Sequence, residues 1–301
     1  DKQGVIDGVE FLSRVAGEAT LHAAGLPADA PLPDVRGKRV AVVGGGDVAI
    51  DVARSSLRMG AREVHVIYRR AGDDMPAAHL PEEIEAARQE GIRFHTLVNP
   101  AEVLGNGAVS GVRLQQQRLA DFDDTARRRP VPLGADSYVL NVEVLIPAIG
   151  QVPDVTWLHG SEIARHRGDT FIVDEAYATT RPGVFAAGDA VTGPATIVEA
   201  VAQGNLVAAS IDHWLKTGQL VKPHLEAERE DVPQVYDLAA YAEHHRPATP
   251  RLSVEKREGS FCEVETGFDE TAAQEEARRC LRCDLEWLDV MKLPRPVIGN
   301  R

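Results

Sequence analysis

A short glycine-rich segment carries the clearest chemical signal in this sequence of 301 residues. Gly44, Gly46 and Ala49 follow four apolar residues, 40–43, which predict a strand buried on both faces. A helical pattern starts at Asp47. A dinucleotide phosphate needs this order, because the first glycine allows a tight turn, the second lets the backbone approach the pyrophosphate, and the small third residue lets the helix pack close to the strand. The N–H groups and the dipole of the helix then face the anion. The pattern therefore favours a nucleotide site over a purely structural strand–turn–helix unit.

The end of the next predicted strand, 64–68, bears on the choice of nucleotide. Sites for NAD usually place an acid at the end of the second strand, where it accepts from the ribose 2′-OH, whereas an arginine there suits a 2′-phosphate. Here the strand ends in Arg69 and Arg70, and the rigid guanidinium fork can bind phosphate in bidentate fashion. Glu63 precedes the strand and is expected at its other end. The sequence favours NADPH over NADH, with a solvated basic turn as the alternative.

A second polar turn follows the apolar run 183–187. Gly188 and Asp189 end a predicted buried strand, and a predicted helix opens near Thr196. A carboxylate there can accept hydrogen bonds from a polyol chain, and the helix N-terminus can face a phosphate or an electron-rich ring edge. Taken alone, a Gly-Asp pair is also an ordinary turn at the end of a strand.

The cysteines form a third constellation, in the tail. Cys280 and Cys283 have C-x-x-C spacing, which suits ligation of an iron–sulfur cluster that normally takes four cysteines, a redox disulfide, or a structural role on a helix. Cys262 would make a third ligand. We interpret the pair first as structural, and second as low-ranking candidate metal ligands that share a [4Fe-4S] cluster with a partner chain.

Composition excludes several classes of protein. A net charge of −13 with mixed signs argues against nucleic acid as the main partner. No apolar run approaches the ~20 residues of a transmembrane helix, so no membrane insertion is expected. Three cysteines exclude a disulfide scaffold and fit a cytoplasmic location. The length favours about two domains.

The remaining elements are predicted from periodicity and from breaker residues. We expect a helix over 81–90, a strand over 93–97, and a change to β structure over 101–148. In that region 120–136 is expected to be an exposed loop, and 138–148 the returning strand. Three further segments complete the expectation: a turn and short helix at 4–16, a connector at 25–34, and a long amphipathic helix from 195 to about 215.

The chain resembles a known family over roughly residues 4–215. The resemblance is to the NADPH-dependent small subunits of bacterial glutamate synthase and their relatives, which are flavoprotein reductases with two dinucleotide-binding domains. It is carried by short motifs in a fixed order: Gly4-Val5-x-x-Gly8-x-Glu10-Phe11-Leu12, Val43-Gly44-Gly45-Gly46-Asp47-x-Ala49-x-Asp51, Tyr68-Arg69-Arg70, Met75-Pro76, Gly91-Ile92-Arg93-Phe94, Val109-Ser110-Gly111-Val112, Ala148-x-Gly150-x-x-Pro153 and Val184-Phe185-Ala186-Ala187-Gly188-Asp189.

The resemblance implies an α/β fold of two Rossmann-like, three-layer dinucleotide-binding domains. An NAD(P)H domain at 34–148 is inserted into an incomplete FAD domain made of 1–33 and 149–220, and an irregular C-terminal tail at 221–301 contacts a partner or an iron–sulfur centre. The implied cofactor-binding residues fall into three groups: Gly44, Gly45, Gly46, Asp47, Val48 and Ala49 at the pyrophosphate of NADP(H) or NAD(H), with Arg69 and Arg70 at the 2′-phosphate; Ile149 and Gly150 near the nicotinamide; and Gly188, Asp189, Ala195, Thr196 and Ile197 at FAD.

The implied function is an FAD-dependent oxidoreductase subunit that passes electrons between NAD(P)H and the iron–sulfur centres of a multi-subunit complex. Its partner would be a subunit that carries those clusters or the terminal catalytic site. No side chain is assigned as catalytic, because hydride transfer between the two cofactors needs alignment and exclusion of water. The alternatives are a disulfide reductase that uses Cys280 and Cys283, and a non-catalytic nucleotide-binding scaffold subunit. Because the chain begins at Asp1 and has one glycine fingerprint, we expect a preceding segment that carries the other.

Overall fold

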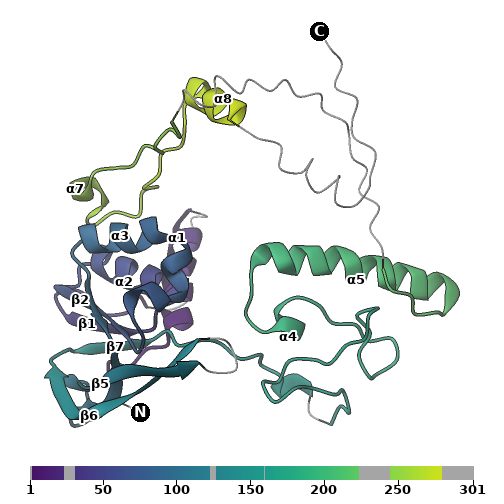
Figure 1. Ribbon diagram of the computed structural model, residues 1–301, viewed down its shortest axis with the longest axis horizontal. Coiled ribbons are helices and arrows are strands. Elements are labelled where there is room, and N and C mark those ends of the chain that lie inside the picture. The colour runs from purple at the N-terminus through teal and green to yellow at the C-terminus, as the bar shows by residue number, and fades with distance from the viewer. Residues whose placement is uncertain (1, 24–30, 123–126, 159, 224–244, 280–301) are drawn as a thin grey trace. The chain divides into compact units, whose positions relative to one another are not determined.

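The computed structural model describes residues 2–23, 31–122, 127–158, 160–223 and 245–279 (Figure 1). These residues divide between two compact units. Unit 1 holds the described residues up to Ile149 together with 245–279, and unit 2 holds those from Gly150 to 223.

A four-stranded parallel sheet forms the centre of unit 1. Its strand order is β3-β2-β1-β7, and all three pairings are parallel. The strands are β1 (Arg39–Val43), β2 (Glu63–Tyr68), β3 (Arg93–Thr96) and β7 (Val144–Pro147). Side chains alternate between the two faces, and both faces are buried, which is why β1 is apolar from Val40 to Val43.

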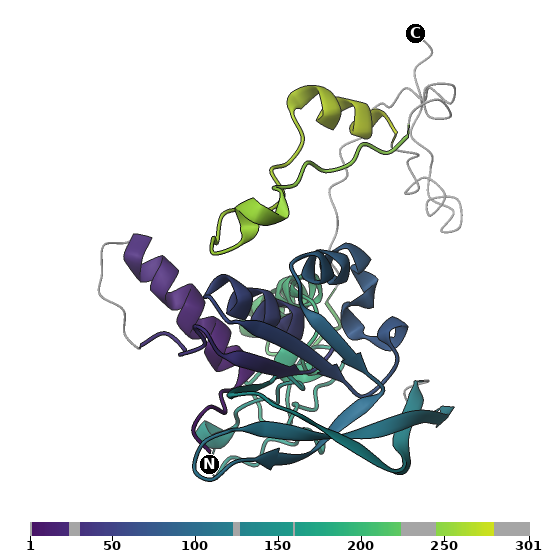
Figure 2. The ribbon, with the colours of Figure 1, turned by 90° about the vertical axis from the view of Figure 1, so that its left-hand side faces the viewer.

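Helices cover one face of this sheet (Figure 2). They are α1 (Gly8–Ala23), α2 (Asp47–Arg58) and α3 (Pro81–Gln89), with the short 3₁₀ segments η1 (Gly72–Asp74) and η2 (Pro76–His79) before α3. Helix α2 buries one stripe of small and branched residues against Val40, Val42, Val64 and Val66. The predicted helices after the first glycine turn and at 81–90 are confirmed.

The other face of the parallel sheet packs against a second, antiparallel sheet. Its strands are β4 (Val98–Leu104), β5 (Gly111–Phe122) and β6 (Arg128–Leu140), in the order β4-β5-β6. Ala41, Ile67 and Leu145 of the parallel sheet share a buried cluster with Val112 and Leu114 of β5. Unit 1 therefore has three layers, namely helices, the parallel sheet and the antiparallel sheet.

The region 120–140 differs from the sequence prediction. The expected exposed loop at 120–136 is wrong, because β5 and β6 pair out to Phe122 and Arg128. Most of β6 is exposed, so the alternating pattern that marks a half-buried strand is missing there. The expected single strand at 138–148 is also wrong. Leu140 ends β6 in the antiparallel sheet, and β7 begins at Val144 in the parallel one.

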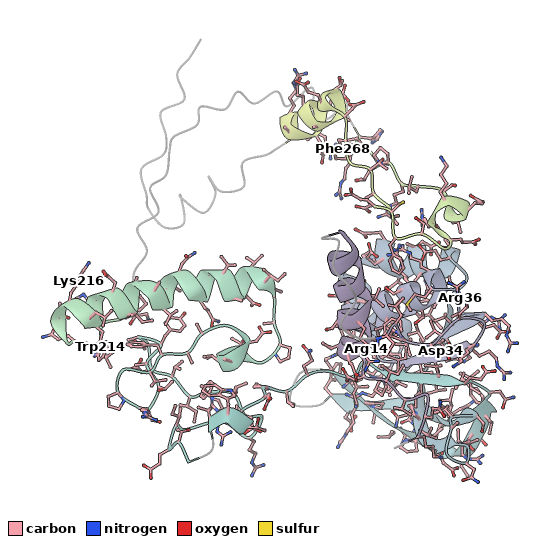
Figure 3. All side chains as sticks on the ribbon, turned by 180° about the vertical axis from the view of Figure 1, so that it is seen from behind. Arg14, Asp34, Arg36, Trp214, Lys216 and Phe268 are labelled. Atoms are coloured by element: carbon pink, nitrogen blue, oxygen red, sulfur yellow. The ribbon has the colours of Figure 1, made fainter. Side chains whose placement is uncertain are left out.

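Unit 2 is dominated by helix α5 (Ile197–Thr217), preceded by η3 (Thr156–Leu158) and α4 (Asp189–Thr192). The α5 helix begins with a capping box and ends at Gly218, whose backbone is left-handed with φ 72°. Near that end Trp214, labelled in Figure 3, packs edge-on against Phe185, with ring centroids 5.8 Å apart. The buried strand expected at 183–189 is wrong. Among the described residues this segment makes one bridge, from Phe185 to Ala178, and it is half-buried or exposed.

The described part of the tail, 245–279, packs with unit 1 and has structure of its own. It contains α7 (Val254–Arg257) and α8 (Glu270–Arg278). An antiparallel bridge joins Arg251 and Glu265. Residues 221–301 are therefore partly ordered rather than irregular throughout.

Candidate functional site

The glycine turn joins β1 to α2 at the carboxyl end of the parallel sheet. Gly44 has φ 152°, and a Cβ there would lie 2.2 Å from the carbonyl oxygen of Ala148 and 3.2 Å from the Cβ of Ala49. A side chain is thus excluded at Gly44 by the close approach of strand β7's end and of α2. Ala49 itself is fully buried, which is the reason for a small residue at the third position of the motif.

The space above Gly46 is open, in contrast to its neighbours. A Cβ at Gly46 would meet nothing closer than the Cβ of Pro76, at 4.0 Å, and the φ of −90° suits any residue. Gly46 is also the N-cap of α2 and carries no side-chain cap, so the first N–H groups of this 12-residue helix have no side-chain oxygen of an N-cap to bond. The geometry leaves room for an anion at the position where the helix dipole favours one.

The middle glycine is required for a different reason. A Cβ at Gly45 would lie 2.5 Å from the ring of Tyr68, the last residue of β2. The carbonyl oxygen of Gly45 accepts a hydrogen bond from the N–H of Ala77 at 3.0 Å. Tyr68 and η2 therefore fix the turn from both sides, and neither contact is visible from the spacing of the motif.

The two arginines after β2 have different surroundings. Arg69 is exposed, whereas Arg70 is 6% exposed and donates from Nε to the carbonyl oxygen of Arg128 at 2.8 Å. Arg127, which the sequence reading did not single out, donates from Nη2 to the hydroxyl of Tyr68 at 3.0 Å. Its position in the run 127–129 was the available signal, but only the hairpin brings that run to β2.

Asp47, Val48, Ile149 and Gly150 complete the residues expected near the pyridine nucleotide. Asp47 is exposed in the first turn of α2, and Val48 is partly buried and packs on the core. Ile149 is 77% exposed as the last residue of unit 1 before Gly150, whose φ is 120°. Gly150 has no atom within 4 Å of a Cβ position, so its conformation, not crowding, calls for glycine.

The five residues expected at FAD come together in unit 2. They line one hollow of about 470 Å³ with Ala187, Ala200 and Gly204. The lining members from the sequence prediction are Gly188, Asp189, Ala195, Thr196 and Ile197.

Backbone geometry shapes this hollow. Gly188 has φ 63° and lies against Ala200, and its N–H donates to Oε1 of Gln203 at 2.8 Å. The carboxylate of Asp189 accepts from the N–H of Ala195 at 3.3 Å, which holds the turn before α5. The N–H of Thr196 donates to Glu199 at 3.0 Å within the capping box.

The first residues of α5 therefore differ in whether their backbone groups already have partners inside the protein. The Thr196 N–H is engaged inside the protein, while Ile197, 83% exposed, begins the helix at the mouth of the hollow. The backbone N–H groups of a first helical turn have no intrahelical acceptor.

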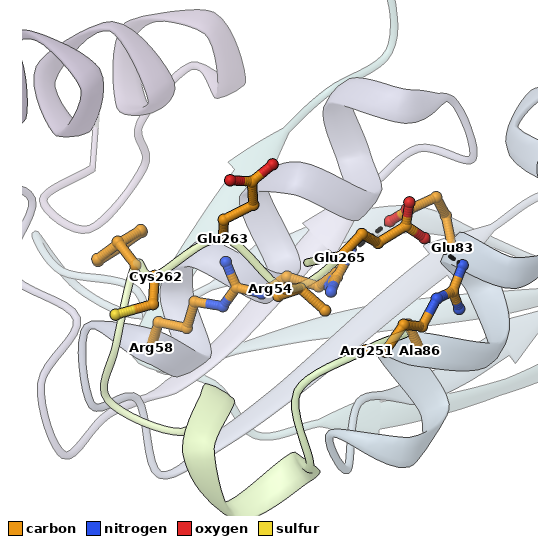
Figure 4. A pocket seen from close by; sticks show the side chains of 10 residues that line it. Arg54, Arg58, Glu83, Ala86, Arg251, Cys262, Glu263 and Glu265 are labelled. Atoms are coloured by element: carbon orange, nitrogen blue, oxygen red, sulfur yellow. Dashed lines mark hydrogen bonds and ion pairs between the residues drawn. The ribbon is translucent and has the colours of Figure 1, made fainter. Parts of the chain in front are cut away.

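A second hollow, of about 280 Å³, lies in unit 1 between α2, α3 and the tail segment (Figure 4). Three arginines and three glutamates line it together with exposed Cys262, so its charges balance. Cys280 and Cys283 lie outside the described residues. Among the residues that are described, no group of three or more His, Cys, Asp or Glu side chains is arranged to hold a metal ion.

Comparison with known proteins decides the family. The family model described as pyridine nucleotide-disulphide oxidoreductase matches residues 5–204. The chain belongs to this family. The match spans the glycine turn in unit 1 and the Gly188–Asp189 hollow in unit 2.

Curated relatives include subunits of larger oxidoreductases. The chain is 46% identical over 259 residues to the NADP(+)-dependent formate dehydrogenase subunit beta of Moorella thermoacetica, covering 83% of this chain and 36% of that protein. It is 34% identical over 285 residues to the NADPH-Fe(3+) oxidoreductase subunit beta of Geobacter sulfurreducens, covering 83% and 42%. It is 35% identical over 223 residues to the glutamate synthase [NADPH] small chain of Escherichia coli K12, covering 72% and 46%. The resemblance seen in the sequence is confirmed, and the chain spans less than half the length of each of these three relatives.

The fold is similar to that of a solved reductase. Thioredoxin reductase of Lactococcus lactis matches with a TM-score of 0.50 and 19% identity, over 71% of this chain and 58% of that one. This similarity supports the α/β fold class alone. Within the described residues, none of the helices combines the length and the apolar character needed to cross a bilayer.

Proposed function

We propose that this chain acts in an FAD-dependent NAD(P)H oxidoreductase subunit that passes electrons between NAD(P)H and the iron–sulfur centres of a multi-subunit complex. In this proposal 34–148 is the NAD(P)H domain, inserted into an FAD domain to which 1–33 and 149–220 contribute. Residues 221–301 form a tail that contacts a partner subunit, and the described segment 245–279 of this tail belongs to unit 1. The names of three relatives as subunits or chains of NADPH-linked oxidoreductases support this assignment.

The glycine turn carries the proposal. Gly44 and Gly45 are closed in by protein atoms, whereas the space at Gly46 is open, directly before the first N–H groups of α2. A purely structural turn has no need for glycine at a position where a Cβ fits and φ is −90°. A pyrophosphate that must approach the backbone there does explain the glycine. Arg69, exposed at the end of β2, would meet the 2′-phosphate, which favours NADP(H) over NAD(H).

The hollow in unit 2 fits part of a flavin nucleotide. Its volume of about 470 Å³, the carboxylate of Asp189 and the start of α5 supply space, an acceptor for a ribityl hydroxyl, and backbone donors for a ring edge. Gly188 and Ala195 would line the chain of the cofactor. Ile149 and Gly150, at the boundary of the two units, would lie near the nicotinamide.

The chemistry of such a protein belongs to its cofactors. When bound, FAD would supply the chemistry that links the two-electron hydride of NAD(P)H to one-electron transfer through iron–sulfur centres. The residues of this chain bind and orient these groups and exclude water between them. Ligation of one cluster by Cys280 and Cys283, shared with the partner, is part of the proposal.

Replacement of Gly46 by valine tests the nucleotide site without disturbing the turn. A Cβ has room there, so the variant should fold, and the branched side chain would occupy the space assigned to the pyrophosphate. We expect the dissociation constant for NADPH, measured by titration calorimetry, to rise about 100-fold, or about 2.7 kcal/mol.

Gly17→Val is the matched control, because Gly17 lies within α1 of unit 1 and has no atom within 4 Å of its Cβ position. This control should bind NADPH as the wild type does. Unchanged affinity in a folded Gly46→Val protein would show that the pyrophosphate lies elsewhere.

A further inference from the structure

The β5–β6 hairpin closes onto the carboxyl end of β2, next to the glycine turn. Nη2 of Arg127 donates to the hydroxyl of Tyr68 at 3.0 Å and to the carbonyl oxygen of Asp74 at 2.5 Å. The Tyr68 hydroxyl also donates to that carbonyl oxygen, at 2.7 Å. Three groups, from the hairpin, β2 and η1, therefore meet at one point.

The side chain of Tyr68 connects this meeting point to the glycine turn. The ring of Tyr68 lies against Gly45, so closely that a Cβ there would be 2.5 Å from it. The tyrosine thus connects the backbone of the turn, on one side, with the guanidinium of Arg127, on the other.

A second contact holds the hairpin in the same place. Arg70 is buried and donates from Nε to the carbonyl oxygen of Arg128 at 2.8 Å. Its guanidinium therefore supports the start of β6, while Arg69 is left exposed at the end of β2. The adjacent pair of arginines in the sequence divides into one structural residue and one surface residue.

In a dinucleotide site of this fold, the end of the second strand faces the ribose of the adenosine half. We propose that Arg127 is a specificity-determining residue for the 2′-phosphate of NADP(H), supplied by the hairpin and acting with Arg69. The inference rests on the nucleotide site proposed above. A guanidinium carries five N–H donors in a planar fork that matches the geometry of phosphate oxygens.

Adenosine 2′,5′-bisphosphate and adenosine 5′-monophosphate differ in the 2′-phosphate and carry no nicotinamide, so they isolate this contact from hydride transfer. Their dissociation constants are measured by calorimetry on the full chain for the wild type and Arg127→Gln. We expect the variant to bind the bisphosphate about 10- to 100-fold more weakly, since it loses a hydrogen bond between charged groups, and the monophosphate within about twofold of the wild type.

Two further variants sharpen the test. Arg129→Gln removes an exposed arginine two residues further along the chain, in β6, and should change neither constant. Arg127→Lys keeps the charge without the fork, so its loss for the bisphosphate should be smaller than that of Arg127→Gln. This lysine variant also serves if the glutamine variant fails to fold.

The outcomes separate this inference from the proposed function. An equal loss for both ligands in Arg127→Gln overturns it, because the residue would then only position the turn. Wild-type affinity for the bisphosphate in Arg127→Gln, with a loss in Arg69→Gln, overturns the role of Arg127 and leaves the nucleotide site standing. Failure of the wild type to bind NADPH and both adenosine ligands overturns the site and the inference together.

Discussion

Two histidines on neighbouring strands of the parallel sheet in unit 1 share a hydrogen bond. Nδ1 of His65, on β2, lies 2.9 Å from Nε2 of His95, on β3, and Nδ1 of His95 lies 3.0 Å from the hydroxyl of Tyr138 on β6. At the other end, Nε2 of His65 is 3.4 Å from the carboxylate of Glu63. This chain of polar groups joins the parallel sheet to the antiparallel hairpin.

Both imidazoles resist protonation in the folded protein. Burial lowers the pKa of His65 below its ordinary value of 6.5, and Arg93 and Arg39 act in the same direction against the opposing effect of Glu63. Burial also lowers the pKa of His95, helped by His65 and Arg93. The unfolded chain therefore binds more protons than the folded one as the pH falls below 6.5.

The free energy of unfolding should consequently fall as the pH is lowered from 7.5 to about 5, with each histidine contributing a slope of up to about 1.4 kcal/mol per pH unit. Urea unfolding at a series of pH values measures it. His95→Gln should flatten the dependence, whereas His245→Gln, at an exposed position in the same unit, should leave it as it is. Parallel curves for the wild type and His95→Gln would contradict this account.

At the residue scale, the sequence predicted those parts of the site that a local motif specifies. The crowding at Gly44, the open space at Gly46 and the burial of Ala49 agree with their spacing between a strand and a helix. Arg127 could not be predicted in the same way, because its neighbour Tyr68 is far away in sequence and the two meet only when the hairpin folds back. Gly45, an unspecified position of the motif, is fixed by that same tyrosine.

Among the elements, the tail segment 245–279 and helix α2 are joined by one buried carboxylate. Glu90, the residue that caps α3, has a side chain that is 2% exposed. It lies 2.9 Å from Nη2 of Arg54 and 3.7 Å from Arg58, both on α2, and 3.7 Å from Arg257 of α7. One buried carboxylate at the end of α3 thus faces guanidinium groups from both α2 and α7, and Arg54 has a second carboxylate partner in Glu83.

Removal of that charge should destabilise unit 1 strongly. In Glu90→Gln, Arg257 would stay buried without the Glu90 carboxylate and Arg54 would keep Glu83 alone, and the loss of one partner of a buried pair costs about 3–5 kcal/mol. Urea unfolding measures the change, and hydrogen exchange over 250–258 should rise with it, because Arg257 anchors α7.

Glu85→Gln is the control for this prediction. Glu85 is exposed on the same helix and accepts a hydrogen bond from Gln89, so its replacement should change the stability by no more than about 0.5 kcal/mol. Equal effects of the two substitutions would refute the proposed importance of the buried carboxylate.

Elements with a clear period were predicted, and elements without one were not. Strand β1 and helix α2 are buried on the faces that their apolar residues mark. The far half of the β5–β6 hairpin is exposed on both faces, and Pro130 and Pro132 lie in it, so its sequence has the composition of a loop. Residues 183–187 show the opposite error, since an apolar run does not become a strand without neighbouring strands to pair with.

At the scale of the whole molecule, the two units do not simply follow one another along the chain. Unit 2 separates two parts of unit 1 in the sequence. The second part, the segment 245–279, is joined to the first by contacts such as that between Arg257 and Glu90. Charged residues in a Pro-rich stretch indicate no partner by themselves, which is why the sequence predicted an irregular tail. The family match crosses the boundary at Gly150, so it includes residues of both units.

If each unit holds one cofactor, each should respond to its own ligand. We expect calorimetry to resolve two unfolding transitions, because each unit has its own internal contacts. A ligand that binds only the folded state stabilises it by about 2.7 kcal/mol at 100 times its dissociation constant, which raises the midpoint of that transition by about 5–10 °C. Adenosine 2′,5′-bisphosphate should raise one transition, and FAD the other.

Crossed variants assign the two transitions. In Gly46→Val the shift with the bisphosphate should disappear while the shift with FAD persists, since the substitution fills a space in unit 1 alone. In Asp189→Ala the reverse should hold, because that carboxylate lines the hollow of unit 2. Loss of both shifts in either variant, or a single transition that moves with both ligands, would mean that one site spans the two units and that the division of the cofactors between them is wrong.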